Sequence, residues 1–149
     1  ELARRFGAAV AIESDRWPDR VRAGAAGAPR AVIVCAGHPE LVPQAIEASA
    51  NGGRVVLFAG FGDRPVAQVD VNAIHYREIE LVGSEWIGAP PNQRRERYGE
   101  AAEIIASGSL PLEELVSARC SFDDLEDALL ARSAFRVLKT VFVPDRADP

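Results

Sequence analysis

The sequence of 149 residues contains no methionine, only two cysteines and two histidines, and a single lysine, Lys139. Cys35 and Cys120 are too few and too far apart for a disulfide framework, so we expect a protein of the reducing cytoplasm. No apolar run reaches the length of a membrane-spanning helix, and we expect no membrane partner. The net charge of −5 argues against a nucleic-acid partner. The remaining composition, 48% hydrophobic and 26% charged, is that of an ordinary globular protein.

Residues that could hold a metal ion are equally scarce. A zinc site needs three or four converging ligands, usually including closely spaced pairs. Cys35 and His38 are three positions apart, but they straddle an expected strand-to-helix turn and no further ligand accompanies them. We therefore expect no metal site within this chain. For His38, a position near a cofactor and a helix-capping role both remain open, whereas His75 is expected to be structural.

Three short apolar runs give the chain its predicted framework. Residues 31–36, 55–59 and 79–83 end at or just before a glycine and predict three strands of a parallel sheet. The first run is continuously apolar, in the pattern of a strand buried on both faces. Residues 41–49 carry apolar side chains at helical spacing, and residues 71–76 predict a shorter helix. Alternating strands and helices form right-handed βαβ units, so the fold class is α/β with a doubly wound parallel sheet.

The first part of the chain is less regular. Residues 1–6 predict the last turns of a helix that Gly7 terminates, and residues 8–13 predict a short strand. Residues 14–29 mix charge, glycine and alanine, and they predict one poor helix. Because the sequence lacks an initiator methionine and opens in a helical pattern, we expect it to be the C-terminal part of a longer protein.

The last part of the chain predicts a long helix followed by a strand–helix–strand segment. The helix spans residues 94–107, and the two strands span residues 115–120 and 137–143, with a helix starting after Ser121 between them. Apolar positions predict the inward faces of the two helices: Tyr98, Ala101, Ile104 and Ile105 in the first, and Leu125, Ala128 and Leu129 in the second.

Glycines follow all three predicted strands of the framework. They occur in Ala36-Gly37, in Ala59-Gly60-Phe61-Gly62 and in Gly83-Ser84. Open parallel sheets bind ligands at the carboxyl ends of their strands, where glycine lets a ligand approach the backbone. Each glycine alone is better explained by a tight turn, but three at successive strand ends favour a ligand crevice.

The stretches at residues 54–62 and 72–84 resemble the second half of the nucleotide-binding domain of medium-chain, zinc-type alcohol and polyol dehydrogenases, the sorbitol-dehydrogenase-like proteins. The resemblance implies a partial Rossmann sheet that lacks its first two strands and its glycine-rich turn. It also implies a partial dinucleotide-binding domain over residues 1–110. Residues 111–149 would then form a C-terminal segment that returns to the catalytic domain of the intact enzyme.

The resemblance also implies a cofactor and the residues that line it. NAD or NADP would lie against Ala36 and Gly37, against Ala59, Gly60, Phe61 and Gly62, and against Gly83 and Ser84, with Lys139 approaching the pyrophosphate. The zinc ligands and the proton relay of the family would belong to an N-terminal domain that precedes this sequence. The intact enzyme would oxidise a small secondary alcohol or polyol, and we expect it to be a homo-oligomer.

Three alternatives remain open. The first is a zinc-independent quinone or enoyl reductase of the same superfamily, and the second is a methyltransferase with a similar sheet. The third is a non-catalytic remnant or interaction module, which the absence of the glycine-rich turn would favour. Because that turn and the first two strands are missing, we expect poor dinucleotide affinity and no activity from the isolated chain. We also expect an open edge beside residues 31–36 and loose packing up to residue 29.

Overall fold

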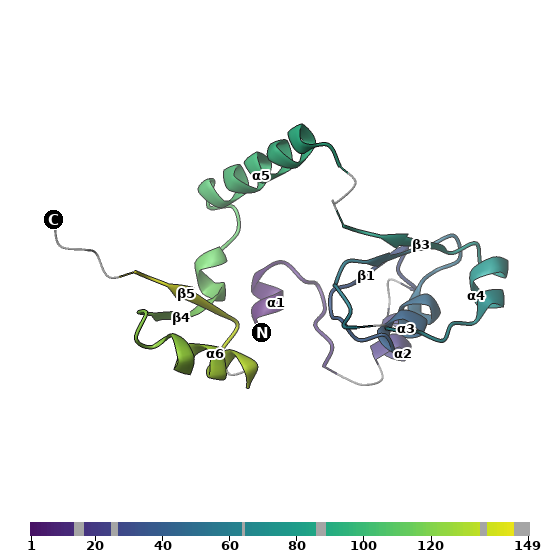
Figure 1. Ribbon diagram of the computed structural model, residues 1–149. Helices are drawn as coiled ribbons and strands as arrows, with labels where there is room; N and C mark the ends of the chain where they lie inside the picture. The colour runs from purple at the N-terminus through teal and green to yellow at the C-terminus, as the bar shows by residue number, and fades with distance from the viewer. Residues whose placement is uncertain (14–16, 25–26, 64, 86–88, 135–136, 145–149) are drawn as a thin grey trace. The chain divides into compact units, whose positions relative to one another are not determined.

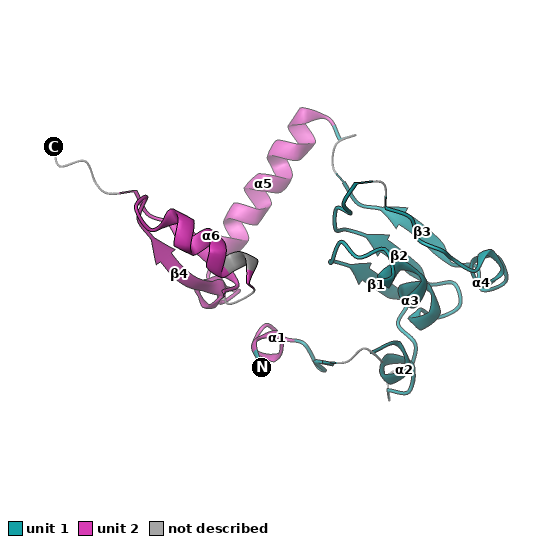
Figure 2. Ribbon diagram, turned by 60° about the horizontal axis from the view of Figure 1, so that its bottom comes forward, with its two compact units in different colours: residues 1, 8–89 teal, residues 2–7, 90–149 magenta. Residues whose placement is uncertain are grey.

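The computed structural model describes residues 1–13, 17–24, 27–63, 65–85, 89–134 and 137–144, with the elements labelled as in Figure 1. The described chain forms two compact units (Figure 2). Unit 1 comprises residue 1 and residues 8–89, and unit 2 comprises residues 2–7 and 90–149. The predicted boundary at residue 110 separates two domains of the resembled family, whereas these units are defined by their compactness. The boundary at residue 110 therefore stays a prediction.

Unit 1 is built on a three-stranded parallel sheet. Strands β1 (Ala31–Val34), β2 (Arg54–Leu57) and β3 (Glu80–Gly83) lie in the order β1-β2-β3. The register pairs Val34 with Leu57 and Leu57 with Gly83, so the three strands end at the same level. The predicted strands are therefore confirmed, as is their assembly into one parallel sheet.

Two helices connect these strands and cover one face of the sheet. Helix α3 (Leu41–Ala48) joins β1 to β2, and helix α4 (Val71–Tyr76) joins β2 to β3 within the predicted bounds. Asp70 begins α4, because its side chain accepts a hydrogen bond from the backbone N–H of Asn72 at 2.9 Å. The buried core lies between the sheet and α3 and consists of Val34, Val42, Ala45, Ile46, Val55 and Ile79.

The opposite face of the sheet is open within the described part of unit 1. Ile33 is 60% exposed and Val82 is 39% exposed, whereas Val34 and Val55, whose side chains point to the α3 face, are buried. The prediction that the first strand is buried on both faces is therefore wrong. Its apolar pattern needs two covering layers, and the described residues supply one. Strand β1 also lies at an edge of the sheet, as predicted.

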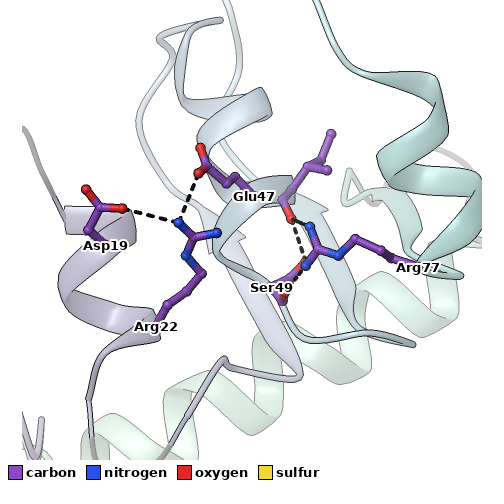
Figure 3. A network of polar contacts seen from close by, with 6 residues as sticks. Asp19, Arg22, Glu47, Ser49 and Arg77 are labelled. Atoms are coloured by element: carbon purple, nitrogen blue, oxygen red, sulfur yellow. Dashed lines mark hydrogen bonds and ion pairs between the residues drawn. The ribbon is translucent and has the colours of Figure 1, made fainter.

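A polar network joins the helices of unit 1 around the end of α3 (Figure 3). Arg22, at the end of helix α2 (Trp17–Arg22), contacts Asp19 at 3.2 Å and Glu47 of α3 at 3.1 Å. Arg77, which follows α4, donates hydrogen bonds to the backbone carbonyls of Ile46, at 3.1 Å, and of Ser49. A guanidinium at this position satisfies carbonyls that the end of a helix leaves unpaired.

The packing of the N-terminal segment corrects two expectations. Residues 8–13 form no strand, and Val10 is 67% exposed, because a strand needs a neighbour to satisfy its backbone groups. The prediction of loose packing up to residue 29 is wrong for α2. Pro18 is buried, Trp17 packs against the core, and the Trp17 indole N–H donates to Gln44 at 2.8 Å.

Unit 2 contains the predicted strand–helix–strand segment. Strands β4 (Val116–Cys120) and β5 (Lys139–Phe142) are parallel, with α6 (Leu125–Ser133) between them in the chain. A short 3-10 helix, η2 (Leu112–Leu115), precedes β4. Helix α1 (Leu2–Arg5) is joined to η2 by an ion pair of 2.6 Å between Arg5 and Glu114.

Helix α5 (Pro91–Ala106) confirms the predicted helix but not its predicted buried face. Every residue of α5 is exposed, including Tyr98 at 78%, Ile104 at 48% and Ile105 at 60%. In α6, Leu125 and Ala128 are half-buried as predicted, but Leu129 is 60% exposed. Helical spacing identifies an apolar face without supplying the partner that would bury it. Among the described residues, no helix is both long and apolar enough to cross a membrane.

Candidate functional site at the carboxyl edge of the sheet

The glycine-bearing loops of unit 1 lie together at one edge of the sheet. Because β1, β2 and β3 are parallel and in register, the residues that follow them share the carboxyl edge. Backbone hydrogen bonds continue the sheet past its strands: Ala59 donates to the carbonyl of Val34 at 3.0 Å, and Ser84 donates to that of Leu57 at 3.0 Å. The structure thus brings together the eight predicted site residues that belong to unit 1.

The loops after β1 and β2 approach each other most closely at two glycines. A Cβ atom at Gly37 would lie 2.4 Å from the carbonyl oxygen of Gly60 and 3.7 Å from the Cα of Phe61. Contacts shorter than 3.0 Å do not occur for real Cβ atoms, so only glycine fits at position 37 in this conformation. Position 37 therefore requires glycine because the Gly60 carbonyl occupies the space that a side chain would need.

The other glycines of this edge have free space around them. A Cβ at Gly60, Gly62 or Gly83 would meet no described atom within 4 Å, excluding immediate chain neighbours. None of the three has a positive φ, so the backbone conformation alone does not require glycine there. Open space above bare backbone at adjacent strand ends is the geometry that admits a flat ligand against the polypeptide.

Phe61 is divided between the edge and the core. Its backbone belongs to the loop after β2, but its side chain is half-buried and packs against the core cluster. The ring lines a hollow of about 300 Å³ on the α3 face, together with Pro39, Leu57 and Leu81 among others. The Phe61 ring thus anchors the loop, and its backbone groups are the part that can face a ligand.

A second hollow, of about 380 Å³, runs along β1. It is lined by Trp17, Cys35, Ala36 and Leu41, among other residues of β1 and α3. Residues 14–29 have no clear helical period, so the sequence did not predict that Trp17 would line a hollow with Ala36. An aromatic side chain thus lines the same hollow as one of the predicted site residues.

Lys139 belongs to the other unit of the chain. It is the first residue of β5 in unit 2, and its side chain is exposed. The glycine edge belongs to unit 1. A role for Lys139 at the cofactor pyrophosphate stays a prediction.

Two titratable side chains of the described residues, Cys35 and His38, lie in the loop after β1. The Nδ1 of His38 lies 3.6 Å from the Glu40 carboxylate, and both side chains are well exposed. Cys35 is exposed and Cys120 is buried, and both are free thiols. Within the described ranges, no group of three or more His, Cys, Asp or Glu residues could hold a metal ion.

Comparison with known proteins relates this geometry to one family. A sequence model described as zinc-binding dehydrogenase matches residues 1–107. The L-threonine 3-dehydrogenase of Bacillus velezensis is 23% identical over 146 residues, which cover 96% of this chain and 40% of that protein. The matched residues include all three strands of the sheet and the glycines at the end of each.

Solved structures share the fold. An alcohol dehydrogenase zinc-binding domain protein from Burkholderia ambifaria superposes with a TM-score of 0.81 at 22% identity, over 95% of this chain and 38% of that chain. A zinc-binding dehydrogenase from Sinorhizobium meliloti, solved bound to NADP, gives a TM-score of 0.76 at 27% identity, over 96% and 41%. The chain therefore spans about two fifths of the length of the relatives it matches.

Proposed function

The chain belongs to the zinc-binding dehydrogenase family, and we propose that it forms the nicotinamide half of the NAD(P) site of an alcohol or polyol oxidoreductase. The intact enzyme would transfer a hydride between a secondary alcohol and the cofactor. The observation that carries the proposal is the open glycine edge, where Gly60, Gly62 and Gly83 leave bare backbone at adjacent strand ends. A Rossmann domain consists of two mononucleotide-binding halves, and its ligand binds at the carboxyl ends of the parallel strands. In this proposal, β1, β2 and β3 are strands of the second half.

The residues of the edge would bind and orient the cofactor without taking part in proton transfer. The nicotinamide ring and its ribose would lie against backbone groups of the three strand ends. These groups belong to Ala36, Gly37, Ala59, Gly60, Gly83 and Ser84. The nicotinamide ring, when bound, supplies the hydride acceptor or donor. Rigid backbone placed on strand ends is suited to holding one face of a planar ring toward a substrate.

Zinc is not assigned to any residue of this chain. The described residues do not bring together the three ligands that a catalytic zinc site needs. Polarisation of the alcohol oxygen would belong to residues outside this sequence. In the intact protein we propose a cytoplasmic homo-oligomer acting on a small alcohol or polyol.

Nuclear magnetic resonance of the uniformly 15N-labelled chain tests the proposal with the two halves of the cofactor. Nicotinamide mononucleotide should shift the amide signals of residues 36–37, 59–62 and 83–84 at millimolar concentration, whereas AMP should leave them unchanged. Equal shifts from AMP and nicotinamide mononucleotide, or shifts confined to unit 2, would contradict the proposed site.

A further inference from the structure

We infer that Gly37 is a positioning residue: it fixes the loop after β2 by making room for the Gly60 carbonyl, and it does so whether or not a cofactor is bound. Glycines at strand ends are expected to admit a ligand. At Gly37 the space a side chain would need is already filled by the protein. The inference rests on the proposed function only in assigning that loop to the nicotinamide site.

Gly37 differs from the other glycines of the same edge in the space around its missing side chain. The missing Cβ of Gly37 would lie 2.4 Å from the Gly60 oxygen, whereas those of Gly60 and Gly83 would meet no described atom within 4 Å. An ordinary contact begins near 3.4 Å. The Gly60 carbonyl would therefore have to withdraw by about 1 Å to accept an alanine at position 37, unless β1 moved instead.

The surrounding contacts limit where that movement can go. The loop after β2 is held on one side by the hydrogen bonds from Phe58 and Ala59 to the carbonyl of Val34, at 3.1 and 3.0 Å. On the other side, the Phe61 side chain packs into the core. Displacement should therefore concentrate at Gly60, which lies between these two anchors and whose own Cβ position would meet no described atom within 4 Å.

This arrangement makes the loop after β1 a template for the loop after β2. Misplacement of a binding group by about 1 Å is enough to reduce the rate of an oriented reaction on the order of a hundredfold. In a cofactor site built from backbone groups, the contact between Gly37 and Gly60 would then set the geometry of two of the three strand ends. Substitution of Gly37 should act through the position of Gly60 as well as through any clash with a ligand.

The test uses the full 149-residue chain without any nucleotide. Amide spectra of Gly37→Ala are compared with those of Gly83→Ala, which also adds one methyl group at a strand end but meets no described atom. We expect the Gly60 and Phe61 amide shifts to change several-fold more in Gly37→Ala than in Gly83→Ala. Changes confined to the immediate neighbours of position 37 would overturn the inference.

A measurement on the unsubstituted chain covers the case in which Gly37→Ala does not fold. A nuclear Overhauser effect between an α-proton of Gly37 and the α-proton of Phe61 is expected from their close approach, and its absence would overturn the inference. Both readouts are made without cofactor. If nicotinamide mononucleotide then fails to bind while the Gly37 results hold, the proposed function fails and the coupling of the two loops stands.

Discussion

Arg77 offers the sharpest test of what holds unit 1 together. Its guanidinium donates to the Ile46 carbonyl at 3.1 Å, to the Ser49 carbonyl, and to the Asn51 side chain at 3.2 Å. It therefore joins the segment after α4 to the end of α3, where carbonyl groups lack helical partners. We expect Arg77→Ala to weaken the attachment of α4, and of β3 that follows it, to the end of α3.

The size of the effect follows from the environment of these bonds. Hydrogen bonds to charged groups contribute roughly 1.5–3 kcal/mol each when they are buried. Arg77 is only half-buried, so water can replace part of each bond. We therefore expect Arg77→Ala to lower the free energy of unfolding by about 2 kcal/mol in total, which is on the order of a thirtyfold change in the folding equilibrium.

Urea denaturation followed by circular dichroism measures this loss. Arg54→Ala is the matched control, because Arg54 makes a cross-strand ion pair with Glu80 in which both side chains are 58% exposed. Such surface pairs contribute roughly 0–1 kcal/mol. Arg77→Lys should be intermediate, because it keeps the charge but loses the planar fork. An Arg77→Ala variant no less stable than Arg54→Ala would refute the reasoning.

Three further predictions follow. Ser49→Ala should lower the free energy of unfolding by less than about 1 kcal/mol, because the buried Ser49 hydroxyl and Arg77 both donate to the Ile46 carbonyl and one donor remains; a larger loss in urea denaturation would contradict this. Gly60→Val should weaken binding of nicotinamide mononucleotide while leaving the circular dichroism spectrum unchanged, because the added side chain enters open space. An unchanged Kd with an intact fold would count against the site. The purified chain should reduce no NAD in the presence of zinc and any polyol, and measurable zinc-dependent reduction would overturn the assignment of zinc to residues outside it.

The sequence was sufficient to predict the three strands of the sheet in unit 1 and the two helices that connect them. Helix α4 occupies the predicted residues because Asp70 begins it and its apolar residues recur at helical spacing over a short segment. The three strands lie within two residues of their predicted bounds, since continuous apolar runs that stop at glycine leave few other readings. The shared carboxyl edge then follows from parallel strands alone.

What the sequence could not supply was the partner of each apolar surface. Tyr98 has the spacing of an inward-facing residue, yet it is exposed on α5, because periodicity does not say what lies opposite. Residues 8–13 have strand propensity but no neighbouring strand to pair with. The reason for Gly37 was also hidden, because its neighbour Gly60 lies 23 positions away in the chain and meets it only in the folded sheet.

We propose that this chain binds the nicotinamide end of the cofactor and not the adenine end. Saturation-transfer difference spectra of NADH mixed with the chain report which protons of the cofactor lie against the protein. We predict the strongest saturation on the nicotinamide ring and its ribose, with little on the adenine. Stronger saturation of the adenine protons, or equal saturation of both ends, would contradict the claim.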